Sequence, residues 1–136
     1  MKKLWCFVAA AVGVSMLLTT GQLFAHHAFA AEFDAQKKVT LKGTIAKMEW
    51  FNPHAWLHIA VKEPDGKELL WAVEFSGGST LLRKGWRKND LPVGGEVTVE
   101  GYLAKNGSRT ANARTVVLAN GKELFAGSSA PDGPGK

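Results

Sequence analysis

Apolar and polar residues alternate along several stretches of this 136-residue chain, and such alternation is typical of half-buried β-strands. In the first stretch, Val39–Trp50, the apolar positions change from one parity to the other near Ala46. Because successive side chains of a strand point to opposite faces, this change predicts an extra residue or a sharp bend, for which Gly43 is suited. A curved first strand of this kind is typical of small barrels.

The next two stretches predict a β-hairpin whose register follows from the side chains themselves. A three-residue loop at Pro64–Gly66 places apolar residues opposite each other on the core-facing side, with opposite charges beside the loop. A shift by one residue would set apolar against polar side chains along the whole pair. Burial of the six apolar side chains stabilises the fold by on the order of 10 kcal/mol before chain entropy is subtracted. The expected pairs are Glu63 with Lys67, Val61 with Leu69, Ile59 with Trp71 and Leu57 with Val73.

A short helix is predicted after the hairpin. Ser79 follows two glycines as an N-cap residue, and Leu82 and Trp86 lie four positions apart, which places them on one helical face. Pro92 follows soon afterwards and favours an end to the helix before it. We therefore expect about two helical turns that close one end of a barrel with Leu82 and Trp86.

Two longer strands and one short strand follow. Residues 96–104 and 110–119 alternate again, and Asn106-Gly107 between them is a strong signal for a hairpin turn. Asn120-Gly121 predicts a further turn, which leads into a short strand at residues 122–125.

The order of three strands, a short helix and two strands is that of the oligonucleotide- and oligosaccharide-binding (OB) barrel. We therefore predict an all-β fold, a small five-stranded OB-like barrel at residues 39–125 with one short helix between strands 3 and 4. Other small barrels and an open meander are the alternatives. Residues 26–38 would form an N-terminal arm. Residues 126–136, almost all of them small, Pro or Gly, would form a disordered tail.

The first 25 residues have the layout of a secretory signal peptide. Two lysines precede an apolar run at residues 4–18, and a more polar stretch ends at Ala25. The run is shorter than the ~20 residues that cross a bilayer, which favours a cleaved signal over a membrane anchor. Cleavage after Ala25 makes His26 the first residue, whereas cleavage after Ala30 removes both neighbouring histidines. We expect a periplasmic or secreted protein with no transmembrane span after cleavage.

Composition then narrows the classes of partner. Cleavage after residue 25 leaves 111 of the 136 residues, enough for one domain and too few for two. Cys6 lies in the signal, so the mature chain would have no disulfide and no thiolate ligand for a metal. Without Lys2 and Lys3, 15 basic residues face 12 acidic ones, and this small surplus does not predict a nucleic-acid partner.

The four histidines lie at two places in the chain. Two follow the signal directly, at residues 26–27, whereas His54 and His58 lie in the second predicted strand. In the hairpin register above, His54, Trp56 and His58 point away from the core, since strand side chains alternate. Glu74 lies opposite Trp56 and reaches His58 diagonally. Two imidazoles, an indole and a carboxylate would therefore share one outer patch, on the face that OB barrels use for ligands.

A metal site is the function that this placement of histidines favours. The free amine and imidazole of a terminal His26 chelate one ion, and His54 would complete three nitrogen ligands, with His27 or His58 as additional candidates. Nitrogen-rich tetragonal coordination suits Cu(II), and Zn(II) is the second candidate. Surface or capping roles for the strand histidines are the alternative, and then no metal cofactor is needed.

A metal-free binding module is the second hypothesis. Trp56 can stack on a glycan, and together with Glu74 it can contact a lipid headgroup or a periplasmic protein partner. Catalysis has little support, because the mature chain would have no thiol, no Gly-x-Ser-x-Gly motif and no phosphate-binding glycine loop.

Two segments resemble those of a family of small exported bacterial proteins of unknown function. Residues 26–34 fit the pattern HH-[AS]-F-x-x-x-[FY]-D, and residues 52–55 fit N-P-H-[AS]. The resemblance covers nearly all of the mature chain and implies export and a compact β domain, without an established activity. His58 is outside the pattern, which favours His54 as the ligand from the second strand. The motif positions are His26, His27, Phe29, Phe33, Asp34, Asn52, Pro53 and His54.

Overall fold

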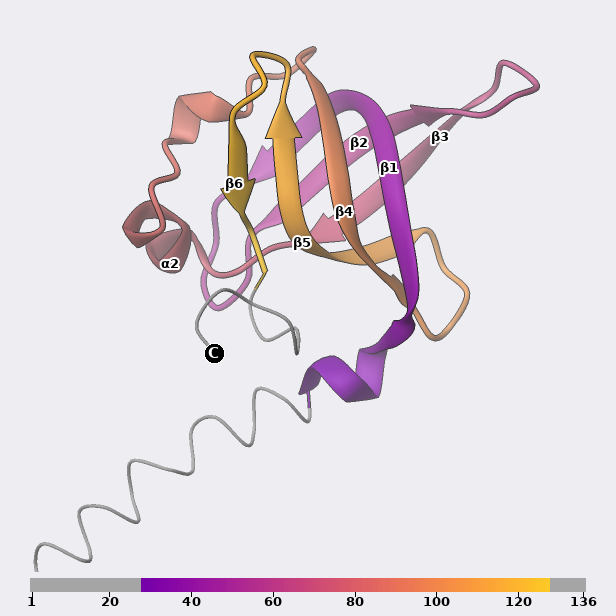
Figure 1. The fold of residues 1–136 in the computed structure, drawn as a ribbon, viewed down its shortest axis with the longest axis horizontal. Helices are drawn as coiled ribbons and strands as arrows, with labels where there is room; N and C mark the ends of the chain where they lie inside the picture. Colours follow the sequence, from indigo (N-terminus) through magenta and orange to yellow (C-terminus); the bar gives the residue numbers. More distant parts are fainter. Residues whose placement is uncertain (1–27, 128–136) are drawn as a thin grey trace, which may run out of the picture.

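The computed structural model describes residues 28–127, and this part of the chain is mostly β (Figure 1). A helical turn at residues 28–32 leads into the first strand, and two short helical segments separate the third and fourth strands. The elements are β1 Phe33–Glu49, β2 Trp56–Lys62, β3 Glu68–Glu74, α2 Gly78–Arg83, the 3-10 helix η1 Lys88–Asp90, β4 Glu96–Ala104, β5 Thr110–Leu118 and β6 Glu123–Phe125.

The sheet closes into a ring. β1 pairs antiparallel with both β2 and β4, β2 pairs with β3, and β4 pairs with β5. A short parallel pairing of β3 with β5 at Ala72–Glu74 closes the ring of strands. β6 pairs antiparallel with β5 but is not needed to close the ring. The first strand reaches two neighbours because it is 17 residues long and strongly curved (Figure 1). It begins at Phe33, six residues before the start predicted from the alternation.

The predicted irregularity in β1 is present. The pairing of β1 with β2 shifts register between Ile45 and Lys47, so Ala46 is the extra residue of a bulge. Gly43 lies where β1 passes close to β2, and a Cβ atom there would overlap the carbonyl oxygen of Ala60. The change of parity in the sequence therefore marks a true bend of the strand.

The predicted hairpin register is confirmed. The backbone N–H of Glu63 donates to the carbonyl of Lys67 at 2.8 Å across the expected loop. Side chains near the ring are fully buried, whereas those toward the tip are half-buried because the hairpin projects beyond the ring (Figure 1). The observed pairs include Leu57 with Val73, Ile59 with Trp71 and Val61 with Leu69.

The predicted helix is present but shorter, and its buried face is different. α2 begins after Gly77 and has no side-chain cap, so the N-cap assigned to Ser79 is wrong. Leu81 is buried while Leu82 is 43% exposed, so Leu82 does not close the ring. Because α2 ends at Arg83, Trp86 lies beyond the helix. Leu82 and Trp86 therefore do not share one helical face.

Trp86 is buried, as expected, and it also holds the C-terminal strand. Its indole N–H donates to the carbonyl of Phe125 at 2.9 Å, and its ring packs against Phe75 with centroids 5.7 Å apart. Ala126 is buried and accepts the backbone N–H of Ser76 at 2.8 Å. Residues 126 and 127, at the start of the predicted tail, thus hydrogen-bond to the folded part of the chain. Residues 128–136, the rest of the predicted tail, lie outside the described residues.

The ring encloses one apolar core, and a second, smaller cluster lies on its outer face. In the second cluster Phe29 and Phe33, from the start of the described chain, pack against Tyr102 of β4. No helix within residues 28–127 has the length and apolar character needed to span a membrane. The main core includes Leu41, Ile45, Leu57, Ile59, Val73, Phe75, Leu81, Trp86, Val97, Val99 and Val116.

Candidate functional site

A buried carboxylate holds the imidazole of His54. His54 lies between β1 and β2, and its Nδ1 contacts Oε1 of Glu74 at the end of β3. The Glu74 side chain is 5% exposed, whereas that of His54 is 41% exposed. An ionised carboxylate only accepts hydrogen bonds, so Nδ1 carries the proton and donates it to Glu74. In the neutral ring, Nε2 then keeps a free lone pair, and it has no hydrogen-bond partner within residues 28–127.

Pairing of three strands explains why Glu74 is buried. It lies opposite Trp56 of β2 on one side and opposite Asn112 of β5 on the other. Asn112 is itself buried, and its Oδ1 atom has no partner in the described part of the chain. A buried carboxylate is costly unless it is hydrogen-bonded, and the Nδ1–H of His54 supplies such a bond. The two side chains therefore fix each other.

The loop that carries His54 is anchored to the start of α2. The side-chain amide of Asn52 donates to Oγ of Ser79 at 3.2 Å, and its Oδ1 accepts the backbone N–H of Ser79 at 3.3 Å. The N–H of Gly78 donates to the carbonyl of Phe51 at 2.8 Å. The Asn52–Pro53 peptide bond is cis. These contacts hold His54 in place from both sides of the loop.

His58 belongs to a separate, more exposed group. Its Nε2 lies 2.9 Å from Oε2 of Glu49, and Nζ of Lys47 lies 2.6 Å from the other oxygen of that carboxylate. The hydrogen bond from Lys47 and then that from His58 lower the pKa of Glu49. The predicted diagonal contact between Glu74 and His58 is wrong, because Glu74 turns toward His54 and is buried. The sequence reading did not pair Glu49 with His58, although both lie on neighbouring strands.

No three His, Cys, Asp or Glu side chains within residues 28–127 lie close enough together to hold a metal ion. His26 and His27, two of the predicted ligands, lie outside these residues. The described chain begins next to them, and its first aromatic residue, Phe29, packs against Tyr102 with ring centroids 5.5 Å apart. Tyr102 pairs with Asn112, which pairs with Glu74. The arm is therefore attached to the outer face that carries the His54–Glu74 pair.

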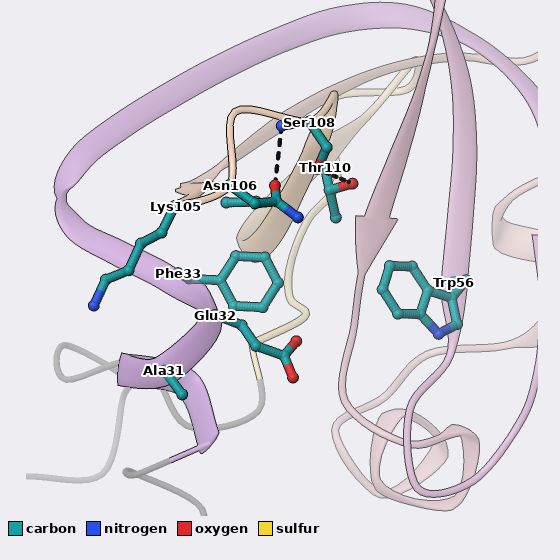
Figure 2. A pocket seen from close by; sticks show the side chains of 9 residues that line it. Ala31, Glu32, Phe33, Trp56, Lys105, Asn106, Ser108 and Thr110 are labelled. Carbon is teal, nitrogen blue, oxygen red and sulfur yellow. Dashed lines mark hydrogen bonds between the residues drawn. The ribbon is translucent and has the colours of Figure 1, made fainter.

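Trp56, the third predicted residue of this face, lines a pocket of about 430 Å³. Figure 2 shows its indole ring on one side, with Phe33 and the carboxylate of Glu32 on the other. Sequence reasoning did not find Glu32, because nothing local indicated where the arm would bind. The lining residues are Ala31, Glu32, Phe33, Trp56, Ala104, Lys105, Asn106, Ser108 and Thr110.

The loop between β4 and β5 forms a further wall of this pocket. Oδ1 of Asn106 accepts the backbone N–H of Ser108 at 2.9 Å, and Oγ of Ser108 donates to Oγ1 of Thr110 at 3.0 Å (Figure 2). Nζ of Lys105 donates to the carbonyl of Ala30. In Figure 2 the Lys105 side chain is directed away from Trp56. Part of the hydrogen-bonding capacity of the loop is thus used within the protein.

Comparison with known proteins gives a family but no activity. The model of a family described as "Family of unknown function (DUF6152)" matches residues 14–113. No curated protein matches the chain, and no solved structure does.

Proposed function

The chain belongs to the DUF6152 family, whose function is unknown, and we propose that it binds a transition metal ion, copper first and zinc second, through His54. The first residue of the processed chain, His26, supplies its amine and imidazole. His27 and His58 are additional candidate ligands. The observation that carries the proposal is the contact between Nδ1 of His54 and the buried carboxylate of Glu74.

That contact prepares His54 to bind a metal. Histidines that bind metals almost always donate the other ring N–H to a carboxylate or carbonyl, which fixes the tautomer and the ring orientation. Glu74 does this at Nδ1, and the 41% exposure of His54 leaves its other edge open to an ion. The anchored loop adds to this preorganisation. His58 is the weaker candidate because its Nε2 is already engaged by Glu49.

Chain length allows the N-terminal histidines to reach this point. Tyr102 and Glu74 are two strands apart, which corresponds to about 10 Å at the usual strand spacing. His26 precedes Phe29 by three residues, and three residues span up to about 10 Å. Since Phe29 is packed on Tyr102, His26 and His54 can approach one ion.

The ligand set favours copper. An amine and two imidazoles are neutral nitrogen donors, and Cu(II) prefers nitrogen-rich tetragonal sites and binds more tightly than Zn(II) in the divalent series. Export belongs to the same proposal, since cleavage after Ala25 creates the terminal amine of His26 in a periplasmic or secreted protein. Mass spectrometry of the exported protein tests this step, and a chain that starts at Ala31 would contradict it.

The ring of strands further supports an OB-type barrel as the scaffold. β1 pairs with both β2 and β4, β3 pairs in parallel with β5, and the short helices lie between β3 and β4. OB barrels bind ligands on the face of strands 2 and 3 and with the loops β1–β2 and β4–β5. His54 lies in the first of these loops, and Trp56 begins β2.

Titration of the processed, metal-free protein with Cu(II) and Zn(II) tests the function. We expect one equivalent of copper to bind, with affinity about 10- to 100-fold lower in Glu74→Gln, because the charged acceptor that orients the ring and raises its basicity is removed. His54→Ala and acetylation of the terminal amine should each weaken binding further. His58→Ala should weaken binding much less than His54→Ala does, because Nε2 of His58 is already engaged by Glu49. Unchanged affinity in both His54→Ala and the acetylated protein would contradict the proposal.

A further inference from the structure

We infer that the pocket beside Trp56 binds a small organic cation, an ammonium group that carries alkyl substituents. The proposal does not rest on the metal site, because the pocket walls come from different side chains. Three segments distant in the sequence form it: the arm at residues 31–33, the start of β2 and the loop between β4 and β5. A volume of about 430 Å³ falls within the usual range for small-molecule sites.

The arm places Glu32 at the pocket by a set of fixed contacts. Phe33 is buried, and it pairs with Ala104 of β4. The carbonyl of Glu32 accepts the backbone N–H of Lys105 at 2.9 Å. Backbone and side chains on both sides of Glu32 are thus held, and its carboxylate is directed into the space that faces Trp56 (Figure 2). A position held in this way needs little reordering when a ligand binds.

The charge of the pocket determines the class of ligand. Glu32 has no ion-pair partner within residues 28–127. Lys105 also lines the pocket, but its ammonium group donates to the carbonyl of Ala30 and is directed away from Trp56 (Figure 2). The charged group that faces Trp56 across the pocket is therefore the carboxylate of Glu32. A cation in the pocket is attracted by the opposite charge of the carboxylate, and by the indole where it lies over the electron-rich ring face.

A neutral sugar fits these walls less well. Sugar recognition needs several free donors and acceptors, and hydrogen bonds within the loop already use Oδ1 of Asn106 and the hydroxyl proton of Ser108. The apolar surface of Phe33 and Trp56 instead suits alkyl groups around a charged nitrogen. Alkylated ammonium groups occur both in free amines and in lipid headgroups, and the two sources share this chemistry.

Choline and its uncharged carbon isostere, 3,3-dimethyl-1-butanol, are the probes. Binding to the full processed protein is measured in chelator by calorimetry and by tryptophan fluorescence, so the outcome is independent of any metal. We expect choline to bind at least about tenfold more tightly than the isostere, since only choline has the charge. Glu32→Gln and Trp56→Leu should each weaken choline binding about fivefold or more.

Glu68→Gln is the matched control, because Glu68 is exposed on the distant hairpin, and it should bind choline as the wild type does. Phosphatidylcholine vesicles separate the two sources: binding that choline competes away supports a headgroup ligand, and binding of choline alone supports a free amine. Equal affinity for choline and the isostere would overturn the proposal. So would wild-type affinity in Glu32→Gln, a variant of an exposed residue that is expected to fold normally.

Discussion

The substitution His54→Ala is expected to destabilise the protein even without a metal, because it leaves the buried carboxylate of Glu74 without its partner. Leaving a buried acceptor without its hydrogen-bond partner costs about 1–3 kcal/mol, and more when the acceptor is charged. His54 is 41% exposed, so water replaces part of the lost interaction, and we expect about 2 kcal/mol. For a domain of this size, that corresponds to a fall of about 10 °C in Tm.

Urea denaturation at pH 7 in the presence of chelator measures this change through the shift of the midpoint. The double variant His54→Ala/Glu74→Gln removes the uncompensated charge, so it should be more stable than His54→Ala alone, and the double-mutant cycle gives the coupling. In the control His58→Ala the urea midpoint should stay unchanged, because the carboxylate of Glu49 still accepts a hydrogen bond from Lys47 and still contacts water. Two results would refute this account of Glu74: a His54→Ala variant that is as stable as the wild type, or a double variant that is less stable than His54→Ala alone.

Three further predictions concern other parts of the molecule. NMR titration should find the pKa of the Glu49 carboxyl below the usual value for a glutamate, and the pKa should rise in Lys47→Met. Any stability that this carboxylate adds is present above the usual glutamate pKa and is lost as the pH falls through the lowered pKa. An unshifted titration would argue against the Lys47 contact. Leu81→Ala should cost about 2–5 kcal/mol in urea denaturation, while Leu82→Ala should cost well under about 1 kcal/mol; equal costs would mean that the buried face of α2 is assigned wrongly. Gly101→Ala should prevent or strongly weaken folding, because its Cβ would overlap the Asn112 carbonyl; a stable variant by circular dichroism would contradict the close approach of β4 and β5.

The β2–β3 hairpin and the bend in β1 were predictable because each has an internal check. In the hairpin, apolar residues on one strand match apolar residues on the other only in one register, and the structure has that register. In β1, a change of parity at Ala46 requires an extra residue, and the bulge lies there. Short-range pattern and strand geometry are sufficient for both features.

The environment of Glu74 was not predictable in the same way. Its burial depends on the parallel pairing of β3 with β5, which places Asn112 beside it, and no local pattern encodes that long-range contact. An alternating strand pattern indicates that Glu74 points away from the core but not what covers it. The position of the arm was not predictable for the same reason. Phe29 and Phe33 are four residues apart, a spacing that suits one helical face, but their packing against Tyr102 depends on the folded ring of strands.

The buried face of α2 shows a third limit. Spacing of Leu82 and Trp86 favoured a helix through both residues, but the helix ends at Arg83 and a left-handed Gly85 follows. The φ of 94° at Gly85 redirects the chain and brings Trp86 into the core by a route that helical periodicity does not describe. Termination by glycine therefore outweighs the periodic signal in this short segment.

Anomalous diffraction from crystals of the copper-loaded, processed protein tests the central claim most directly. We predict a copper peak about 2 Å from Nε2 of His54, with Nδ1 of the same ring still on Glu74 and the amine of His26 in the coordination sphere. A copper ion bound elsewhere, with Nε2 of His54 free of it, would contradict the account.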